Sequence, residues 1–271
     1  MDEPGQARGG QVSLLDPAER ALIGKLQQER LLGAPASEPR TLFESSWRDY
    51  VFAEVWTRPG LDRRSRYFVS ISSAVCEGGR PDVVDGYIRG ALKLGEITLP
   101  ELREAALQIA VYGGWSRGIS FDTAVTRVAD SLGLANAGYP PIRDQPWDPN
   151  ERMSDGCANF KSVMAFPAPP PFTPYFQGGI LNFVFGEMWM RPGLDQRARR
   201  WVTLVGVADS SASTPIRTHT YAAMASGNAS PAEMQEFVLQ YAIHGSWPKA
   251  SVIQAAVLEM AERVTKGLPY G

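Results

Sequence analysis

Hydrophobic residues recur every three to four positions along most of this chain, as on the buried face of an amphipathic helix. Capping signals mark where several such helices begin, because Asp, Thr or Ser precedes a Glu by three positions at 16–19, 41–44, 98–101 and 230–233. No stretch alternates apolar and polar residues as a half-buried strand does, and no Asn-Gly hairpin signal is present. The pattern therefore predicts an all-α protein.

The predicted helices cover residues 17–32, 41–57, 61–75, 83–92, 98–112 and 120–132, and then 176–190, 194–209, 214–226, 231–245 and 248–265. Residues 1–11 are expected to form a disordered tail. The stretch 135–175 is rich in proline, which fixes φ and lacks an N–H donor. We expect no long helix there but an extended strap, held along the surface by aromatic residues such as Phe160 and Phe172.

One stretch of the chain occurs twice, as FAEVWTRPGLDRRSR at 52–66 and as FGEMWMRPGLDQRAR at 185–199. A second pair follows in the same order, LQIAVYGGW at 107–115 and LQYAIHGSW at 239–247. Such self-similarity indicates a duplicated unit. We therefore expect two pseudo-symmetric lobes, each with its own core. The expected organisation is an N-terminal tail and short helix (1–40), a first repeat (41–134), a proline-rich strap (135–175) and a second repeat (176–271).

The order of these motifs resembles the carboxymuconolactone decarboxylase-like superfamily, which also includes alkylhydroperoxidase D. The motifs are FxEvWxRPGLDxRxR, an apolar helix, a helix of the HxxxA type that ends in Gly, and LQxAxxGxW. The resemblance covers most of 41–133 and 173–265 and implies two tandem all-α lobes with that family's fold. Relatives with one such unit assemble as trimers or hexamers, so the resemblance also implies a homo-oligomer, for example a trimer.

The composition is that of an ordinary globular protein, with 44% hydrophobic and 21% charged residues in 271. A net charge of −2 provides no basic surface for nucleic acid or an anionic membrane, so neither is expected as a partner. No apolar run is long enough to span a membrane, and the polar N-terminus lacks a signal core, so we expect a cytoplasmic protein. Cys76 and Cys157 are interpreted as free thiols.

The chain contains two histidines, His219 and His244, and both lie in the second repeat. The register of the repeats places Tyr87 and Tyr112 at their positions in the first. A histidine titrates near neutral pH and is therefore a candidate proton carrier. The alternative interpretation is that both are partly buried rings on packed helices. The resemblance favours a functional role for His219, which falls on the family's active-site histidine.

In the peroxidase branch of the family, the resemblance implies a Glu and a CxxC motif before this histidine. The Glu position holds Arg200 here and Tyr67 in the first repeat, and the chain has no CxxC. A disulfide-cycling peroxidase needs two neighbouring thiols. A thiol peroxidase that uses Cys76 is therefore the least favoured function, and Cys76 is better interpreted as a small buried residue.

In the decarboxylase branch, the resemblance implies a reaction without metal or organic cofactor on a small lactone that carries a carboxylate. Loss of CO₂ leaves an enolate-like charge, which requires a cation and a general acid. The candidates are Arg199 to bind the carboxylate, His219 to deliver the proton and Glu187 to orient either. The alternative is that Glu187–Arg199, and equally Glu54–Arg66, are structural ion pairs between neighbouring helices.

The candidate substrate-binding residues are Arg200, Trp189, Trp201, His244 and Trp247, and the first-lobe counterparts of the site are Tyr87, Arg66, Glu54 and Tyr112. Two histidines without a nearby Cys partner do not make a metal site. The sequence thus predicts a cofactor-independent, decarboxylase-like lyase or isomerase that acts on a small, fairly hydrophobic carboxylic acid or lactone. The alternative is a catalytically degenerate family member that binds a ligand or serves in assembly, because Tyr67, Tyr87 and Arg200 replace family residues.

Overall fold

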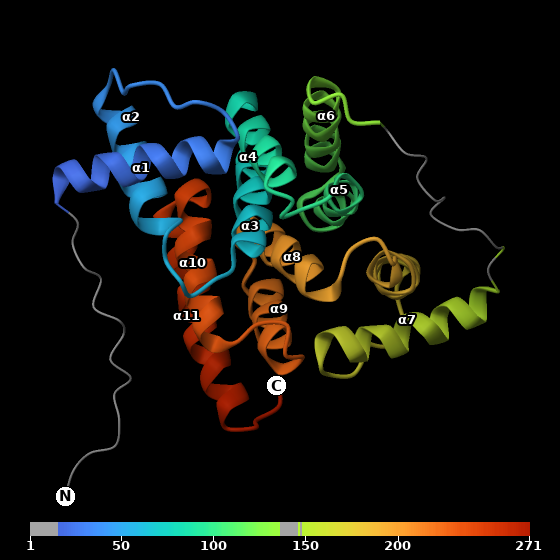
Figure 1. Cartoon of the computed structure of the whole chain (residues 1–271). Helices are drawn as coiled ribbons and strands as arrows, with labels where there is room; N and C mark the ends of the chain where they lie inside the picture. The colour runs from blue at the N-terminus through green and yellow to red at the C-terminus, as the bar shows by residue number, and fades with distance from the viewer. Residues whose placement is uncertain (1–15, 136–145, 147) are drawn as a thin grey trace, which may run out of the picture.

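The computed structural model describes residues 16–135, 146 and 148–271, so the tail predicted at 1–11 lies outside the described part of the chain. The described residues form helices and no strand, which confirms the all-α fold (Figure 1). The first helices are α1 (Pro17–Leu32), α2 (Leu42–Ser46), the π-helix η1 (Trp47–Val55), α3 (Arg63–Cys76), α4 (Pro81–Lys93), α5 (Leu99–Gly113) and α6 (Trp115–Ser131). The next are α7 (Pro149–Met164), the π-helix η2 (Tyr175–Phe185), the 3₁₀-helix η3 (Met188–Met190), α8 (Gln196–Ser210), α9 (Ser213–Ala225), α10 (Pro231–Gly245) and α11 (Trp247–Thr265).

Local capping explains why several helices begin where the sequence predicts. The Asp16 side chain accepts a hydrogen bond from the first turn of α1. Thr98 with Glu101, and Ser230 with Glu233, form reciprocal capping boxes at α5 and α10. Each cap satisfies N–H groups that the helix leaves unpaired, and such a cap contributes about 1 kcal/mol. None of the helices in the described ranges is long and apolar enough to cross a membrane.

The strap predicted at 135–175 is wrong in one respect, because it contains the 16-residue helix α7. Pro149 is the first residue of this helix, where proline costs no hydrogen bond, and the next proline is Pro167, beyond its end. Asp148 caps the helix. The number of prolines in the stretch was therefore misleading, because their positions leave the interior of the helix free.

The helix predicted at 41–57 also differs, since α2 continues as the π-helix η1. Thr41 caps α2 as predicted, by accepting from the backbone of Glu44. We identified no separate signal for the wider π turn in the sequence. The π-helix η2 begins the second half in the same way.

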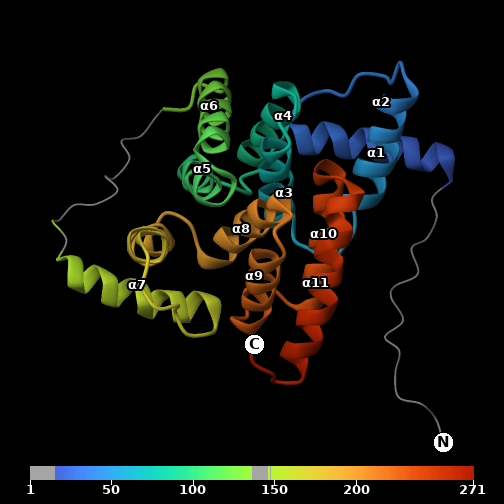
Figure 2. The ribbon, with the colours of Figure 1, turned by 180° about the vertical axis from the view of Figure 1, so that it is seen from behind.

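Helices α3 and α8 lie side by side at the centre of the molecule (Figures 1 and 2). Helices α10 and α11 run along one side of this pair, and α5 and α6 lie on the other (Figure 1). We call residues 41–134 the first half and 176–271 the second half. Helix α5 of the first half packs on α8 of the second, and α10 of the second half packs on α3 of the first. Each half thus places one helix against the centre of the other.

Because of this exchange, the expectation that each lobe has its own core is wrong. The larger cluster of buried apolar residues contains Phe68 and Ile109 from the first half together with Trp201 and Phe237 from the second. A smaller cluster joins α7 and η2 to α9, with Phe160 at its centre. The main core is therefore shared by the two halves.

A network of buried charges joins the halves at the repeated RPGLDxRxR stretch. In one direction, Arg199 donates to Glu104 Oε2 at 2.9 Å and to Gln108 Oε1 at 3.4 Å. Arg191 donates to Glu104 Oε1 at 2.6 Å. A Cβ at Gly193 would lie 2.7 Å from Glu104 Cγ, which explains the glycine in the motif. The repeated residues of one half therefore bind helix α5 of the other.

The same contacts occur in the opposite direction. Arg66 donates to Glu236 Oε2 at 3.0 Å and to Gln240 Oε1 at 2.7 Å, and Arg58 donates to Glu236 Oε1 at 2.6 Å. A Cβ at Gly60 would lie 2.6 Å from Glu236 Cγ. We call both sets of contacts the inter-lobe network. The reciprocity is the structural counterpart of the repeated sequence.

The ion pairs predicted within each half are wrong. Glu187 pairs with Arg152 at 2.8 Å and not with Arg199. Glu54 pairs with Arg20 at 2.6 Å. Arg66 and Arg199 bind helices across the interface instead, because α5 and α10 bring carboxylates that are distant in sequence.

Candidate functional site

Helices α8 and α9 bring Arg200 and His219 together with two aromatic residues, Tyr112 and Trp189. We call these four residues the His219 cluster. Nδ1 of His219 lies 3.3 Å from Nη1 of Arg200, and the ring of Tyr112 meets the imidazole edge to face at 5.1 Å between centroids. Trp189 Nε1 donates to Tyr112 Oη at 2.8 Å, and the Arg200 guanidinium lies 4.9 Å from the centre of the Trp189 ring. The cluster therefore combines a cation, an imidazole and a phenol.

Arg200 is fully buried and is paired only with neutral groups. It donates to the carbonyl of Val163 at 2.5 Å and to Asn228 Oδ1 at 3.3 Å. Among the described residues, no carboxylate forms a salt bridge with it. Burial lowers the pKa of Arg200 to about 10, so it stays charged at neutral pH. A buried cation without a counter-charge is costly, and an anionic ligand would offset this cost.

His219 is 7% exposed, and its Nε2 has no hydrogen-bond partner among the described residues. Burial and then the Arg200 cation lower the pKa of His219 well below its ordinary value, so the free protein holds a neutral imidazole. Burial raises the pKa of Tyr112, which keeps its proton. Of the two rings, His219 is therefore the one whose pKa a bound anion would raise toward neutrality.

The equivalent positions of the first half hold Tyr87, Tyr67 and Trp56, to which α10 adds His244. We call these four residues the Tyr87 cluster. His244 Nε2 lies 3.3 Å from Tyr87 Oη, and Trp56 stacks on Tyr87 at 5.6 Å. Tyr67 occupies the position of Arg200 and donates to the carbonyl of Leu31 at 2.7 Å. This cluster therefore lacks the buried cation.

The sequence placed both imidazoles in one predicted site of the second half, and the structure corrects this. Helix α10 carries His244 to Tyr87 of the first half, and α5 carries Tyr112 to His219 of the second. Each cluster thus contains one imidazole and one phenol drawn from different halves. The register of the repeat shows which positions correspond, but it cannot show that two helices are exchanged.

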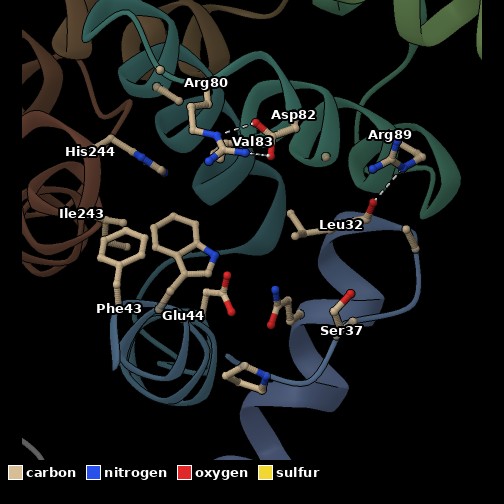
Figure 3. A pocket seen from close by; sticks show the side chains of 18 of the residues that line it. Leu32, Ser37, Phe43, Glu44, Arg80, Asp82, Val83, Arg89, Ile243 and His244 are labelled. Atoms are coloured by element: carbon tan, nitrogen blue, oxygen red, sulfur yellow. Dashed lines mark hydrogen bonds and ion pairs between the residues drawn. The ribbon is translucent and has the colours of Figure 1, made fainter. Parts of the chain in front are cut away.

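A cavity of about 950 Å³ opens beside the Tyr87 cluster (Figure 3). It is lined by the end of α1, the following segment, α2, η1, the end of α3, α4 and the end of α10, and it is open to solvent on one side. His244 lines it, is half-buried and packs edge to face against Trp47 at 5.5 Å. Burial lowers the pKa of His244 to about 4. Sequence reasoning missed Trp47 and the rest of this lining, because it comes from elements that are far apart along the chain.

The structure does not bring all the predicted site residues together. Arg199 lies in the inter-lobe network, and Glu187 pairs with Arg152. Trp201 is 1% exposed and stacks on Phe237 in the shared core. Trp247 is exposed beside Tyr50.

The first-lobe counterparts are also divided. Arg66 belongs to the inter-lobe network and Glu54 pairs with Arg20, whereas Tyr87 and Tyr112 enter the two clusters. Of the predicted residues, His219, Arg200, Trp189 and Tyr112 therefore share one site, and His244 joins Tyr87 in the other cluster.

The thiols are poorly placed for redox chemistry. Cys76 and Cys157 are free, and burial raises the pKa of the Cys76 thiol to about 12. A thiol with so high a pKa forms little of the reactive thiolate at neutral pH. Within the described ranges, no group of three or more His, Cys, Asp or Glu side chains is arranged to hold a metal ion.

Comparison with known proteins agrees with the fold. The sequence model of the Carboxymuconolactone decarboxylase family matches residues 42–124, which lie in the first half. The 4-carboxymuconolactone decarboxylase of Acinetobacter baylyi is 31% identical over 97 residues, which is 36% of this chain and 69% of that relative. The chain belongs to the carboxymuconolactone decarboxylase family.

Proposed function

We propose that the protein is a cofactor-independent, decarboxylase-like lyase or isomerase that acts on a small, fairly hydrophobic carboxylic acid or lactone at the His219 cluster. The observation that carries this proposal is Arg200, a fully buried cation without a carboxylate partner among the described residues, in contact with the imidazole of His219. The reaction class is supported by the family and by a relative that is a 4-carboxymuconolactone decarboxylase.

Arg200 suits a decarboxylation because negative charge stays on the substrate throughout. When the bond to the departing carboxylate breaks, its electron pair moves into the conjugated carbonyl group and forms an enolate, while CO₂ leaves. A buried guanidinium that faces the enolate oxygen stabilises this charge more strongly than water does. Arg200 therefore replaces Arg199 as the proposed cation of the reaction, and its proposed target is the enolate oxygen rather than the substrate carboxylate.

His219 is the proposed proton carrier. In the free protein, burial and the Arg200 cation keep its pKa well below the ordinary value. A bound anion offsets the charge of Arg200, so the pKa of His219 rises on binding and the imidazole can take up a proton. It then protonates the carbon of the enolate. Tyr112, whose own proton is retained, is the alternative donor beside it.

The apolar side of the cluster suits a hydrophobic substrate. Trp189 stacks on Phe185 with ring centroids 6.1 Å apart, and Met188 beside them is buried. Such a wall favours the apolar part of a small acid and excludes water from the enolate. Glu187 precedes this wall and pairs with Arg152, so its proposed role is to position the wall rather than to touch the substrate.

The test is to incubate the protein with 4-carboxymuconolactone and to follow CO₂ release. The expected result is that His219→Ala and Arg200→Met each lower the rate by a hundredfold or more. Arg217→Gln is the matched control, because Arg217 lies on the same helix as His219 but pairs with the half-exposed Glu259. This control is expected to keep the rate of the wild type.

Two results would contradict the proposal. If His219→Ala and Arg200→Met turn over the substrate as fast as the wild type, the cluster is not the catalytic site. If neither this lactone nor any small acid or lactone is turned over, the degenerate, ligand-binding alternative replaces it. The raised pKa of Cys76 gives no support to a thiol peroxidase.

We also propose that the protein forms a homo-oligomer, as the family resemblance implies. The exposed apolar side chains Trp115 and Ile119 on α6 and Leu258 on α11 are candidates for the contact surface. Light scattering coupled to size-exclusion chromatography tests this, and a monomer at micromolar concentration would refute it.

A further inference from the structure

We propose that the cavity beside the Tyr87 cluster is a second ligand site, which binds a bulky aromatic carboxylic acid and holds its carboxylate with Arg89. The site lies between α1 with the segment that follows it, the first half and α10, whereas the proposed reaction uses α8, α9 and α5. It is therefore independent of that reaction.

The size of the cavity determines the size of the ligand. About 950 Å³ lies near the upper end of the roughly 300–1,000 Å³ typical of sites for drug-sized molecules. A small lactone would leave most of this space to water. The wall is mixed, and its apolar side chains include Leu32, Phe43, Trp47, Val83 and Ile243. Two of these side chains carry flat aromatic rings, which favours a ligand with an aromatic body.

The charges on the wall determine the sign of the ligand. The carboxylates already have partners, in the pairs Asp82–Arg80, Glu38–Lys25 and Glu77–Lys249, and in the contact of Glu44 with the backbone N–H of Arg40. A cationic ligand would therefore compete with an existing cation at three of these four carboxylates. Of the cations that line the cavity, Arg40 and Arg89 form no ion pair among the described residues, and Arg89 is the one that the structure holds in place.

Arg89 is half-buried on α4, and its Nε donates to the carbonyl of Leu32 at 3.1 Å (Figure 3). This bond anchors the guanidinium to the end of α1. No carboxylate among the described residues pairs with Arg89, so its two Nη groups remain available to a ligand. An arginine fixed in this way can bind a carboxylate through two parallel hydrogen bonds.

His244 lies at the opposite end of the cavity from Arg89 in Figure 3. Its Nε2 contacts Tyr87 Oη, and its Nδ1 has no partner among the described residues. The imidazole thus offers one further hydrogen bond to the far end of the ligand. The recognition pattern is a carboxylate at Arg89, an aromatic body along Trp47 and Phe43, and a polar substituent at His244.

Isothermal titration with 2-naphthoate tests this proposal, with 2-naphthamide as the uncharged analogue. We expect 2-naphthoate to bind the wild type, and Arg89→Gln to raise its Kd at least tenfold while the Kd of 2-naphthamide stays the same. Arg127→Gln is the matched control. Arg127 lies on α6 and pairs with Asp85, which is on the same helix α4 as Arg89, but Arg127 does not line the cavity. Its Kd is expected to equal that of the wild type.

A second variant, Val83→Trp, fills the cavity and is expected to abolish binding of both probes. If Arg89→Gln fails to fold by circular dichroism, this variant decides: lost binding supports the proposal and retained binding overturns it. Absence of 2-naphthoate binding at millimolar concentration overturns it, as does an equal Kd in Arg89→Gln and the wild type. Binding that is lost in Arg200→Met but kept in Arg89→Gln would place the probe at the His219 cluster and also overturn the proposal.

Discussion

The inter-lobe network predicts a large loss of stability when the charge of Glu104 is removed. Glu104 is buried and accepts hydrogen bonds from Arg191 at 2.6 Å and from Arg199 at 2.9 Å. Glu104→Gln keeps the size of the side chain but leaves Arg199, which is 1% exposed, without a counter-charge. Breaking a buried ion pair from one side costs roughly 3–5 kcal/mol. Because glutamine keeps one acceptor, we expect the lower end, about 3 kcal/mol.

The measurement is the free energy of unfolding from urea denaturation near neutral pH, followed by circular dichroism. Glu259→Gln serves as the control, because Glu259 and its partner Arg217 are both about 40% exposed, at 42% and 43%. An exposed pair contributes at most about 1 kcal/mol. A loss below about 1 kcal/mol for Glu104→Gln would refute the argument that this carboxylate holds the two halves together.

The reciprocity of the network extends this prediction to Glu236, which binds Arg58 and Arg66 in the same way. Glu236→Gln is expected to cost a similar amount, and a loss in only one of the two variants would show that the halves are joined asymmetrically.

The pKa values of Glu104 and Glu236 make this stabilisation depend on pH. Burial raises the pKa of each carboxyl, but the hydrogen bonds from the arginines outweigh burial, so each pKa lies below its ordinary value. The stabilisation is therefore present above the unfolded pKa of about 4.3 and is lost as pH falls through the native value. The difference between wild type and variant should shrink in acid.

Two further predictions concern buried titratable groups. The imidazole of His244 should titrate near pH 4 by NMR, because burial lowers its pKa to about 4. The free energy of unfolding should therefore fall as pH drops from the ordinary pKa of 6.5 toward 4, because the unfolded chain takes up a proton on this ring before the folded one does. His244→Gln should show a smaller fall over the same range. A midpoint near 6.5 would show that the ring is solvated. Cys76 should resist a thiol-specific reagent until the protein unfolds, because burial raises its pKa to about 12, whereas the half-buried Cys157 should react in the native state. Rapid modification of both thiols would contradict the burial of Cys76.

Much of the local structure followed from signals that act within a few residues. The Asp16 cap, the capping boxes at Thr98 and Ser230, and the periodic apolar positions located the main helices to within a few residues. The exceptions were also local in origin. Pro149 was counted as a helix breaker although it begins α7, and the stretch that forms the π-helix η1 was predicted as part of an α-helix.

The candidate site was only partly predictable for a different reason. His219, Arg200 and Trp189 lie within about thirty positions of one another on the repeated pattern, so the family resemblance could select them. Tyr112, which completes the cluster, comes from α5 of the other half. Nothing near Tyr112 in the sequence indicates this contact.

The sequence by itself therefore indicated most of the helices, the repeated motifs and the family, because caps, periodicity and motifs depend on neighbouring residues. The tertiary structure alone decided which residues meet across the halves. Arg199 binds Glu104 rather than Glu187, and His244 joins Tyr87 rather than His219, because α5 and α10 are exchanged between the halves. That exchange depends on how whole apolar faces pack against α3 and α8, and this is a property of the assembled core rather than of any single stretch.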